Sequence, residues 1–147
     1  DTTTPSANKV ATAPSTTAIA NGIANLSDEA TDYTIIMNKL TYAKFKEAQY
    51  GNNYGVDVFE GCKVRFNNTL PAYDAASVGD VYAIVGDLYQ GTIANFPNGI
   101  GNVQFKFDEL SRKKEDLVEV LGREFVGMGV VADKAFALLT KPTNSEE

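Results

Sequence analysis

The stretch from Asp80 to Leu139 constrains the fold of this chain more than any other part of the sequence. Two Gly-Asp pairs enclose a short apolar run, residues 81–85, which is typical of a buried β-strand. Farther along, Val103, Phe105 and Phe107 alternate with polar residues, and this period of two predicts a strand with one wet face. The stretch therefore favours a fold built around a sheet.

The segment 109–125 carries two conflicting signals. Its apolar residues recur at the spacing of a helical face. Against a helix stand Gly122, Gly127 and Gly129, because each glycine costs about 1 kcal/mol relative to alanine in a helix interior. The apolar pattern by itself favours a helix, and an extended segment is the alternative that the glycines support.

The first half of the chain is expected to alternate helices and strands. Ile19, Ile23 and Leu26 fall on one face of a helix that begins near Thr17. The β-branched run 33–37 predicts a buried strand, and a half-buried strand is expected within 58–66. Together with the later strands, this order predicts an α+β domain with a mixed central sheet.

A second helix is expected over residues 40–50, after Asn38, whose side chain can cap it. The residues expected on its inward face are Leu40, Ala43, Phe45 and Ala48. The core of the sheet is expected to hold Ile35, Val64, Ile84, Phe105 and Phe107.

Composition excludes several kinds of chemistry. The 147 residues include no histidine, which removes the usual general base and the commonest zinc ligand. A single cysteine, Cys62, excludes an internal disulfide and is interpreted as a small apolar strand residue. The net charge of −6 argues against non-specific nucleic-acid binding. No catalytic, cofactor-binding or metal-binding residue is predicted, and no apolar run approaches the length of a membrane span.

Two polar motifs are interpreted as turn chemistry. The lone Gly-x-Gly at 99–101 opens no helix, so a turn explains it better than a phosphate loop. Asp80 and Asp87 flank the strand at 81–85, where an aspartate typically accepts backbone N–H bonds.

Aromatic residues near predicted loops are the candidates for contacts between subunits. Aromatic rings give a large contact area, and four tyrosines lie in or beside loops. These candidates are Tyr50, Tyr54, Tyr73 and Tyr89.

Several short motifs, in their order along the chain, resemble one known family. They are Ile36-Met37-Asn38 followed by Thr41-Tyr42, Gly61-Cys62-Lys63-Val64, Val85-Gly86-Asp87, Gly122-Arg123-Glu124-Phe125 with Gly127, and Ala135-Phe136-Ala137-Leu138-Leu139. Their order and spacing resemble the C-terminal part of tailed-bacteriophage major capsid proteins of the Hong Kong 97 fold. The resemblance covers the chain from about Ala18 to Leu139.

The resemblance implies a domain plan. Residues 1–14, rich in Thr, Ser, Ala and Pro, are expected to be a flexible lead-in, or an extended segment that orders on a neighbouring subunit. Residues 15–121 would form the axial domain, and 122–147 the return strands of the peripheral domain and a tail. The resemblance also implies a long β-strand or hairpin near the C-terminus, about 117–131, so residues 113–131 are expected to be mainly extended.

The function implied is that of a structural subunit of a phage or prophage icosahedral capsid, which is no enzyme and carries no cofactor. Its partners would be other copies of itself, in pentamer and hexamer rings, and other head proteins such as portal or scaffold. No membrane and no sequence-specific nucleic acid is expected as a partner. The location would be the virion, after assembly in the bacterial host cytoplasm. The alternatives are an encapsulin-like nanocompartment shell and a ligand-binding surface or secreted module.

By the same resemblance, the family's N-terminal arm, extended loop and spine helix would precede Asp1. The chain is therefore expected to be a C-terminal portion that folds but does not close into shells by itself.

Overall fold

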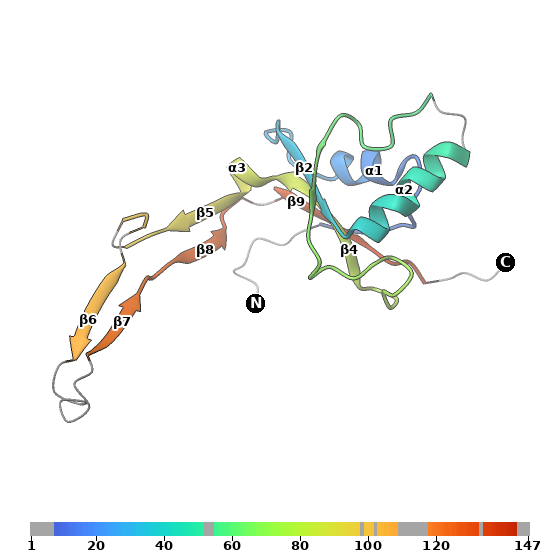
Figure 1. Cartoon of the computed structure of the whole chain (residues 1–147). Helices are drawn as coiled ribbons and strands as arrows, with labels where there is room; N and C mark the ends of the chain where they lie inside the picture. The colour runs from blue at the N-terminus through green and yellow to red at the C-terminus, as the bar shows by residue number, and fades with distance from the viewer. Residues whose placement is uncertain are drawn as a thin grey trace. The chain divides into compact units, whose positions relative to one another are not determined.

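The structure, a computed structural model, describes residues 8–51, 55–97, 99–101, 103–108, 118–132 and 134–143 (Figure 1). The chain divides into two compact units. The sheet unit comprises residues 1–92 and 130–147, and the hairpin unit comprises residues 93–129.

In its described residues, the sheet unit contains two helices, a helical turn and five strands. In chain order they are β1 (Asn8–Ala11), α1 (Ala18–Ala24), β2 (Tyr33–Met37), α2 (Lys39–Gly51), β3 (Lys63–Phe66), β4 (Val81–Asp87), α3 (Leu88–Gly91) and β9 (Phe136–Thr140). The strands form one sheet in the order β1-β9-β4-β2-β3. β4 runs antiparallel to both of its neighbours, whereas β1 and β3 pair in parallel at the two edges. The predicted α+β fold with a mixed central sheet is confirmed.

The register of the central strands places the core on one face of the sheet. Ile35 pairs with Val85, and Val85 with Ala137, so the three side chains form a row across β2, β4 and β9. All three are fully buried, as is the next row of Met37, Ala83 and Leu139. Of the expected core residues, Ile35 is therefore confirmed, while Val64 and Ile84 are only half-buried.

Helix α1 lies directly against this face. A Cβ added at Gly22 would be 3.3 Å from Leu139 Cδ2 and 3.5 Å from Val85 Cγ2. Glycine therefore lets the helix backbone approach β4 and β9 closely. The expected face of this helix is confirmed for Ile19 and Leu26, which are buried.

Helix α2 begins after Asn38, as predicted, and the Leu40 N–H donates to Asn38 Oδ1 at 3.0 Å. Its inward face is confirmed for Phe45, which is buried, but Leu40 and Ala43 are exposed and Thr41 is buried in their place. The face is set by a hydrogen bond of a polar residue, Thr41, which the spacing of apolar residues cannot predict. The Thr41 hydroxyl accepts the backbone N–H of Tyr73 at 3.1 Å, which fixes that face toward the core.

The expected lead-in proves to be partly structured. Residues 8–11 form β1, an edge strand whose Val10 packs against the core, so a flexible segment is wrong for these residues. Asn8 Nδ2 donates to the Asn25 carbonyl, and Thr12 N–H to the Thr140 carbonyl at 3.1 Å. These hydrogen bonds hold β1 in place, and the composition of residues 8–11 does not predict them.

The hairpin unit is made of paired strands. β5 (Thr92–Asn95) pairs with β8 (Gly127–Val130), and β6 (Gln104–Asp108) pairs antiparallel with β7 (Glu119–Arg123). The prediction of an extended chain is confirmed for 119–123 and 127–130, although as two strands rather than one long one. Residues 109–117, for which a helix also stayed open, lie outside the described residues.

Two expected core residues lie in this unit and are not buried. Phe105 is 61% exposed and Phe107 is 66% exposed. Period-two alternation identified their strand correctly, but a two-stranded ribbon supplies no second layer to cover its apolar face. The expected domain boundary between 121 and 122 falls inside β7 and does not coincide with a boundary of either unit.

None of the helices in the described part of the chain has the length and apolarity that crossing a bilayer requires.

Candidate functional site

Two of the tyrosines expected at subunit contacts are well exposed. Tyr89, on α3, is 91% exposed, and Tyr50, near the end of α2, is 57% exposed. Tyr54 lies outside the described residues. An exposed ring can bury a large area against another chain, so Tyr50 and Tyr89 stay candidates for contact.

Tyr73, in contrast, is engaged within the sheet unit. Its ring meets Tyr82 edge to face, with 5.1 Å between centroids, and Lys141 Nζ lies 5.2 Å from its centroid. Its backbone N–H donates to the Thr41 hydroxyl. These contacts hold the loop of residues 71–80 onto the sheet unit and leave less of the ring available to a second subunit.

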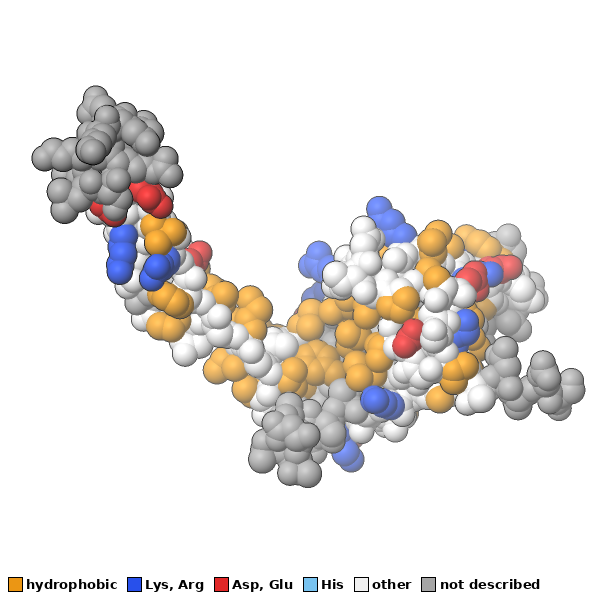
Figure 2. All heavy atoms as spheres, turned by 90° about the horizontal axis from the view of Figure 1, so that it is seen from below, with side chains coloured by type: hydrophobic (Ala, Val, Ile, Leu, Met, Phe, Trp, Pro, Cys, Tyr) orange, Lys and Arg blue, Asp and Glu red, His pale blue; other side chains and the backbone are white. Residues whose placement is uncertain are grey.

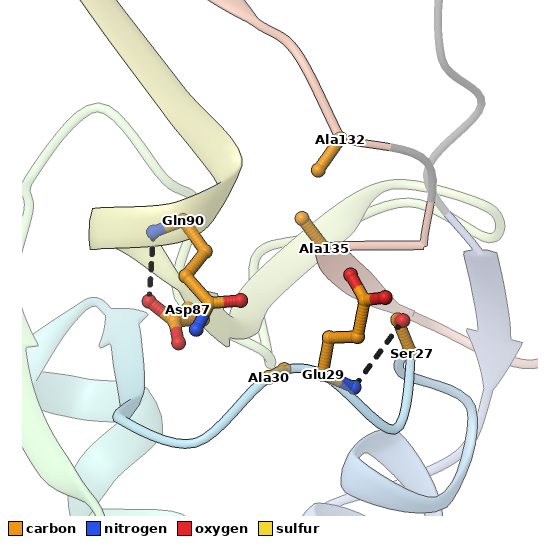
Figure 3. Close-up of a pocket in the computed structure, with 7 residues that line it drawn as sticks. All are labelled: Ser27, Glu29, Ala30, Asp87, Gln90, Ala132 and Ala135. Atoms are coloured by element: carbon orange, nitrogen blue, oxygen red, sulfur yellow. Dashed lines mark hydrogen bonds between the residues drawn. The ribbon is translucent and has the colours of Figure 1, made fainter.

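The sheet unit has a hollow of about 310 Å³ beside α3. It is lined by Ser27, Glu29, Ala30, Asp87, Gln90, Ala132 and Ala135 (Figure 3). Two carboxylates among these residues invite an acid–base role, but the Asp87 carboxylate is already engaged. Its Oδ1 accepts the N–H groups of Tyr89 and Gln90 at 2.9 and 3.1 Å.

Asp87 is in fact a structural junction. Its Oδ2 accepts the N–H groups of Thr31 and Asp32 at 3.1 and 3.2 Å, so one buried side chain ties the end of β4 to α3 and to the loop before β2. Burial raises the pKa of the Asp87 carboxyl, but the N–H donors outweigh it, and the pKa lies below its ordinary value. Asp80 acts similarly and accepts the Ser77 N–H at 2.8 Å, so the predicted turn-capping role holds for both aspartates.

The remaining candidates for chemistry also have structural explanations. Cys62 is half-buried against the core, and burial, together with Glu60 and Asp57, raises the pKa of its thiol. A raised pKa disfavours the thiolate that a nucleophile or metal ligand needs. Within the described residues, no group of three or more Cys, Asp or Glu side chains is arranged to hold a metal ion.

The hairpin unit presents an apolar face that includes Phe105 and Phe107, two residues expected in the core. In the β6–β7 pair, Phe105 is opposite Gly122 and Phe107 is opposite Val120, so these side chains share one face. The Phe105 ring lies over Gly122, where an added Cβ would be 3.4 Å from it. Figure 2 shows hydrophobic side chains along this unit. Exposed apolar side chains that share one face make this face a candidate contact surface.

The opposite face of the same ribbon is polar with one exception. Its side chains are Gln104, Lys106 and Asp108 from β6 and Glu119, Leu121 and Arg123 from β7. Asp108 stands directly opposite Glu119 at one end, and Gln104 opposite Arg123 at the other. The alternation of side chains in β6 predicts a polar face for that strand. That Leu121 lies on the same face follows only from the pairing of β7 with β6.

Comparison with known proteins finds solved structures of similar fold. No protein-family model and no curated protein matches the sequence. Among solved structures, the capsid of an empty gene transfer agent (GTA) particle computed with C5 symmetry matches with a TM-score of 0.70. The match covers 94% of this chain and 51% of that chain, at 16% sequence identity.

The capsid of the native GTA particle, also computed with C5 symmetry, matches with a TM-score of 0.72 over 94% of this chain and 50% of that chain, at 18% identity. The chain has the fold of a phage-like capsid protein. The family resemblance predicted from short motifs is thus confirmed at the level of the fold. The chain spans about half the length of the capsid chains it matches.

Proposed function

We propose that this chain is a structural subunit of a phage-like icosahedral capsid of the Hong Kong 97 type. The observation that carries the proposal is the fold similarity to GTA capsids, which extends over 94% of the chain. The exposed apolar face of β6–β7 is a second support, because a subunit of a shell needs surfaces that are satisfied only in the assembly.

The proposed mechanism is self-assembly without catalysis. Identical subunits would meet head to tail in rings that close as pentamers and hexamers. The sheet unit, with its own buried core, would serve in the axial domain, and the exposed Tyr50 and Tyr89 would contribute contacts between neighbours. The proposed location is the virion, after assembly in the bacterial host cytoplasm, with portal or scaffold proteins as further partners.

The direct test is to purify phage-like particles by density gradient from cells that carry this gene and to digest them for mass spectrometry. The proposal predicts that tryptic peptides of this chain are among the most abundant peptides in the particle fraction. Peptides found only in the fraction of small soluble proteins would overturn it.

A second test concerns the 147-residue chain by itself. Because it spans about half of the capsid chains it resembles, we expect weak or partial oligomers, with rings at high concentration. Light scattering across a concentration series, followed by electron microscopy, would check this. Particles of shell size formed by this chain alone would contradict the expectation.

A further inference from the structure

We propose that two copies of this chain pair through the outer edge of β7, antiparallel and centred on Leu121, to make a continuous four-stranded sheet in the order β6-β7-β7-β6. This inference names a contact through which copies meet, and it therefore rests on the proposed self-assembly. It follows from the register of one described strand pair.

The edge of β7 is open. β7 pairs with β6 on one side, and among the described residues no strand pairs with it on the other. An open edge presents a row of backbone N–H and C=O groups that can template another strand. Charged side chains, lysine above all, and proline usually discourage such pairing. The sequence Glu-Val-Leu-Gly-Arg of β7 contains neither lysine nor proline, and its two charges are opposite in sign.

The charges of β7 are self-complementary in this register. When two copies run antiparallel about Leu121, Glu119 of one copy stands opposite Arg123 of the other, and the reciprocal pair forms as well. In the described residues, the ion pairs lie in the sheet unit and include neither Glu119 nor Arg123. Cross-strand pairs of opposite charge stabilise a sheet, so association supplies each with a partner.

The same register places a cation beside two carboxylates. Asp108 and Glu119 stand directly opposite each other across β6 and β7. In the proposed sheet, Arg123 of the second copy follows Glu119 along that row.

The apolar side chains fit the pairing as well. Leu121 is the single apolar residue among the six on the polar face of the ribbon, and it is 44% exposed. At the centre of the pairing it meets its own copy, which covers it. On the other face, Val120 stands opposite Gly122 of the second copy, and the two ribbons join Phe105 and Phe107 of both copies into one apolar surface.

Two other described edges, those of β6 and β3, lack this property. Antiparallel self-pairing of β6 about its centre would place Lys106 opposite Lys106 of the second copy. The edge strand β3 exposes Lys63 and Arg65, two cations without an anion in the same strand. Self-complementarity of charge therefore points to β7.

Charge reversal provides a matched test on the whole 147-residue chain. Glu119→Arg and Arg123→Glu should each weaken dimerisation, measured by sedimentation equilibrium, at least about tenfold in Kd, since each places like charges opposite each other twice per dimer. The double variant E119R/R123E restores opposite charges and should return to within about threefold of the parent Kd. Lys106→Glu, on β6, is the matched control and should leave the Kd within about threefold.

Cross-linking tests the register. In a Cys62→Ala background, Leu121→Cys should form a disulfide-linked dimer under air oxidation, because paired residues lie about 4.5–5.5 Å apart between Cα atoms. Lys106→Cys in the same background should cross-link far more slowly. Faster cross-linking at position 106 than at 121 would place the contact elsewhere and overturn the proposal.

Two further results would overturn it. One is a parent chain that stays monomeric up to about 0.5 mM, well above the Kd of a weak specific contact. The other is a double variant that associates as poorly as the single ones.

If purified particles contain the chain but the swaps leave dimerisation unchanged, the capsid function stands and this contact fails. If the swaps behave as expected but no particle contains the chain, the contact stands and the capsid function fails.

Discussion

The two units of this chain treat their apolar side chains in opposite ways. In the sheet unit, rows of side chains from β2, β4 and β9 are fully buried beneath the helices. In the hairpin unit, every described residue of β6 and β7 is exposed, phenylalanines included. The sheet unit is therefore stabilised by its own core. The hairpin unit leaves the apolar face of β6 and β7 exposed.

The largest expected effect is on the free energy of unfolding when one aromatic side chain in each unit is replaced by alanine. Tyr82 is fully buried, lies 6.4 Å from Phe45 between ring centroids, and donates its hydroxyl hydrogen to the Thr12 carbonyl at 2.7 Å. Tyr82→Ala should lower the free energy of unfolding by about 3–5 kcal/mol. Phe107→Ala, in the exposed ribbon, should change it by less than about 0.5 kcal/mol.

Urea unfolding followed by circular dichroism measures both variants. Tyr82→Phe is a milder companion that keeps the ring and loses only the bond to Thr12, with an expected cost of about 1–2 kcal/mol. Equal losses for Tyr82→Ala and Phe107→Ala would contradict the contrast between the units.

The second effect concerns the carboxylate at the junction of the sheet unit. Asp87→Asn leaves one acceptor oxygen for four N–H donors and should cost about 2–4 kcal/mol at pH 7. The folded-state pKa of Asp87 is lowered, so its stabilising contribution is present above the ordinary aspartate pKa of about 3.9. That contribution is lost as the pH falls through the lowered folded-state value.

Unfolding free energies of parent and variant between pH 7 and pH 2 check this prediction. The difference between them should shrink toward the acid end, where the parent carboxyl is also protonated. A difference that stays constant with pH would mean that the charge of Asp87 is not what its N–H donors stabilise.

The third effect compares one glycine from each unit. A Cβ at Gly86 would be 2.4 Å from the Ala135 carbonyl oxygen and 2.5 Å from the Phe136 ring, whereas one at Gly129 would meet nothing within 4 Å. Gly86→Ala should therefore destabilise by about 1–3 kcal/mol, and Gly129→Ala should be within about 0.5 kcal/mol of the parent. Thermal unfolding of the two variants side by side measures this, and a neutral Gly86→Ala would show that β4 and β9 can move apart.

The contrast between a buried core and an exposed strand pair also explains which parts of the fold the sequence could predict. Strands and helices of the sheet unit were predictable because burial leaves apolar runs and caps in the sequence, as at residues 33–37 and at Asn38. The inward face of α2 was not, because Thr41 is held by a hydrogen bond rather than by apolar burial. β1 also escaped prediction, since an edge strand needs few apolar residues to pair.

The hairpin unit shows the limit of periodicity more clearly. Alternation in 103–107 predicted a strand, and the glycines between 122 and 129 favoured an extended chain, and both predictions are confirmed by β6, β7 and β8. Periodicity reports which side chains share a face, but not whether the same chain covers that face. The sequence predicts contact residues among tyrosines near loops, whereas Phe105 and Phe107 are exposed on a strand pair, where alternation is equally compatible with a core.

Hydrogen–deuterium exchange, resolved by peptide, tests most directly whether the sheet unit is self-sufficient and the hairpin unit depends on other copies. The 147-residue chain would be measured at concentrations below and above its association midpoint. In the dilute sample, amides of β4 and β9 should exchange only through global unfolding, while those of β6 and β7 exchange fast. In the concentrated sample, β7 should gain protection while β4 and β9 keep theirs. Protection of β6 and β7 equal to that of β4 in the dilute sample would contradict this account.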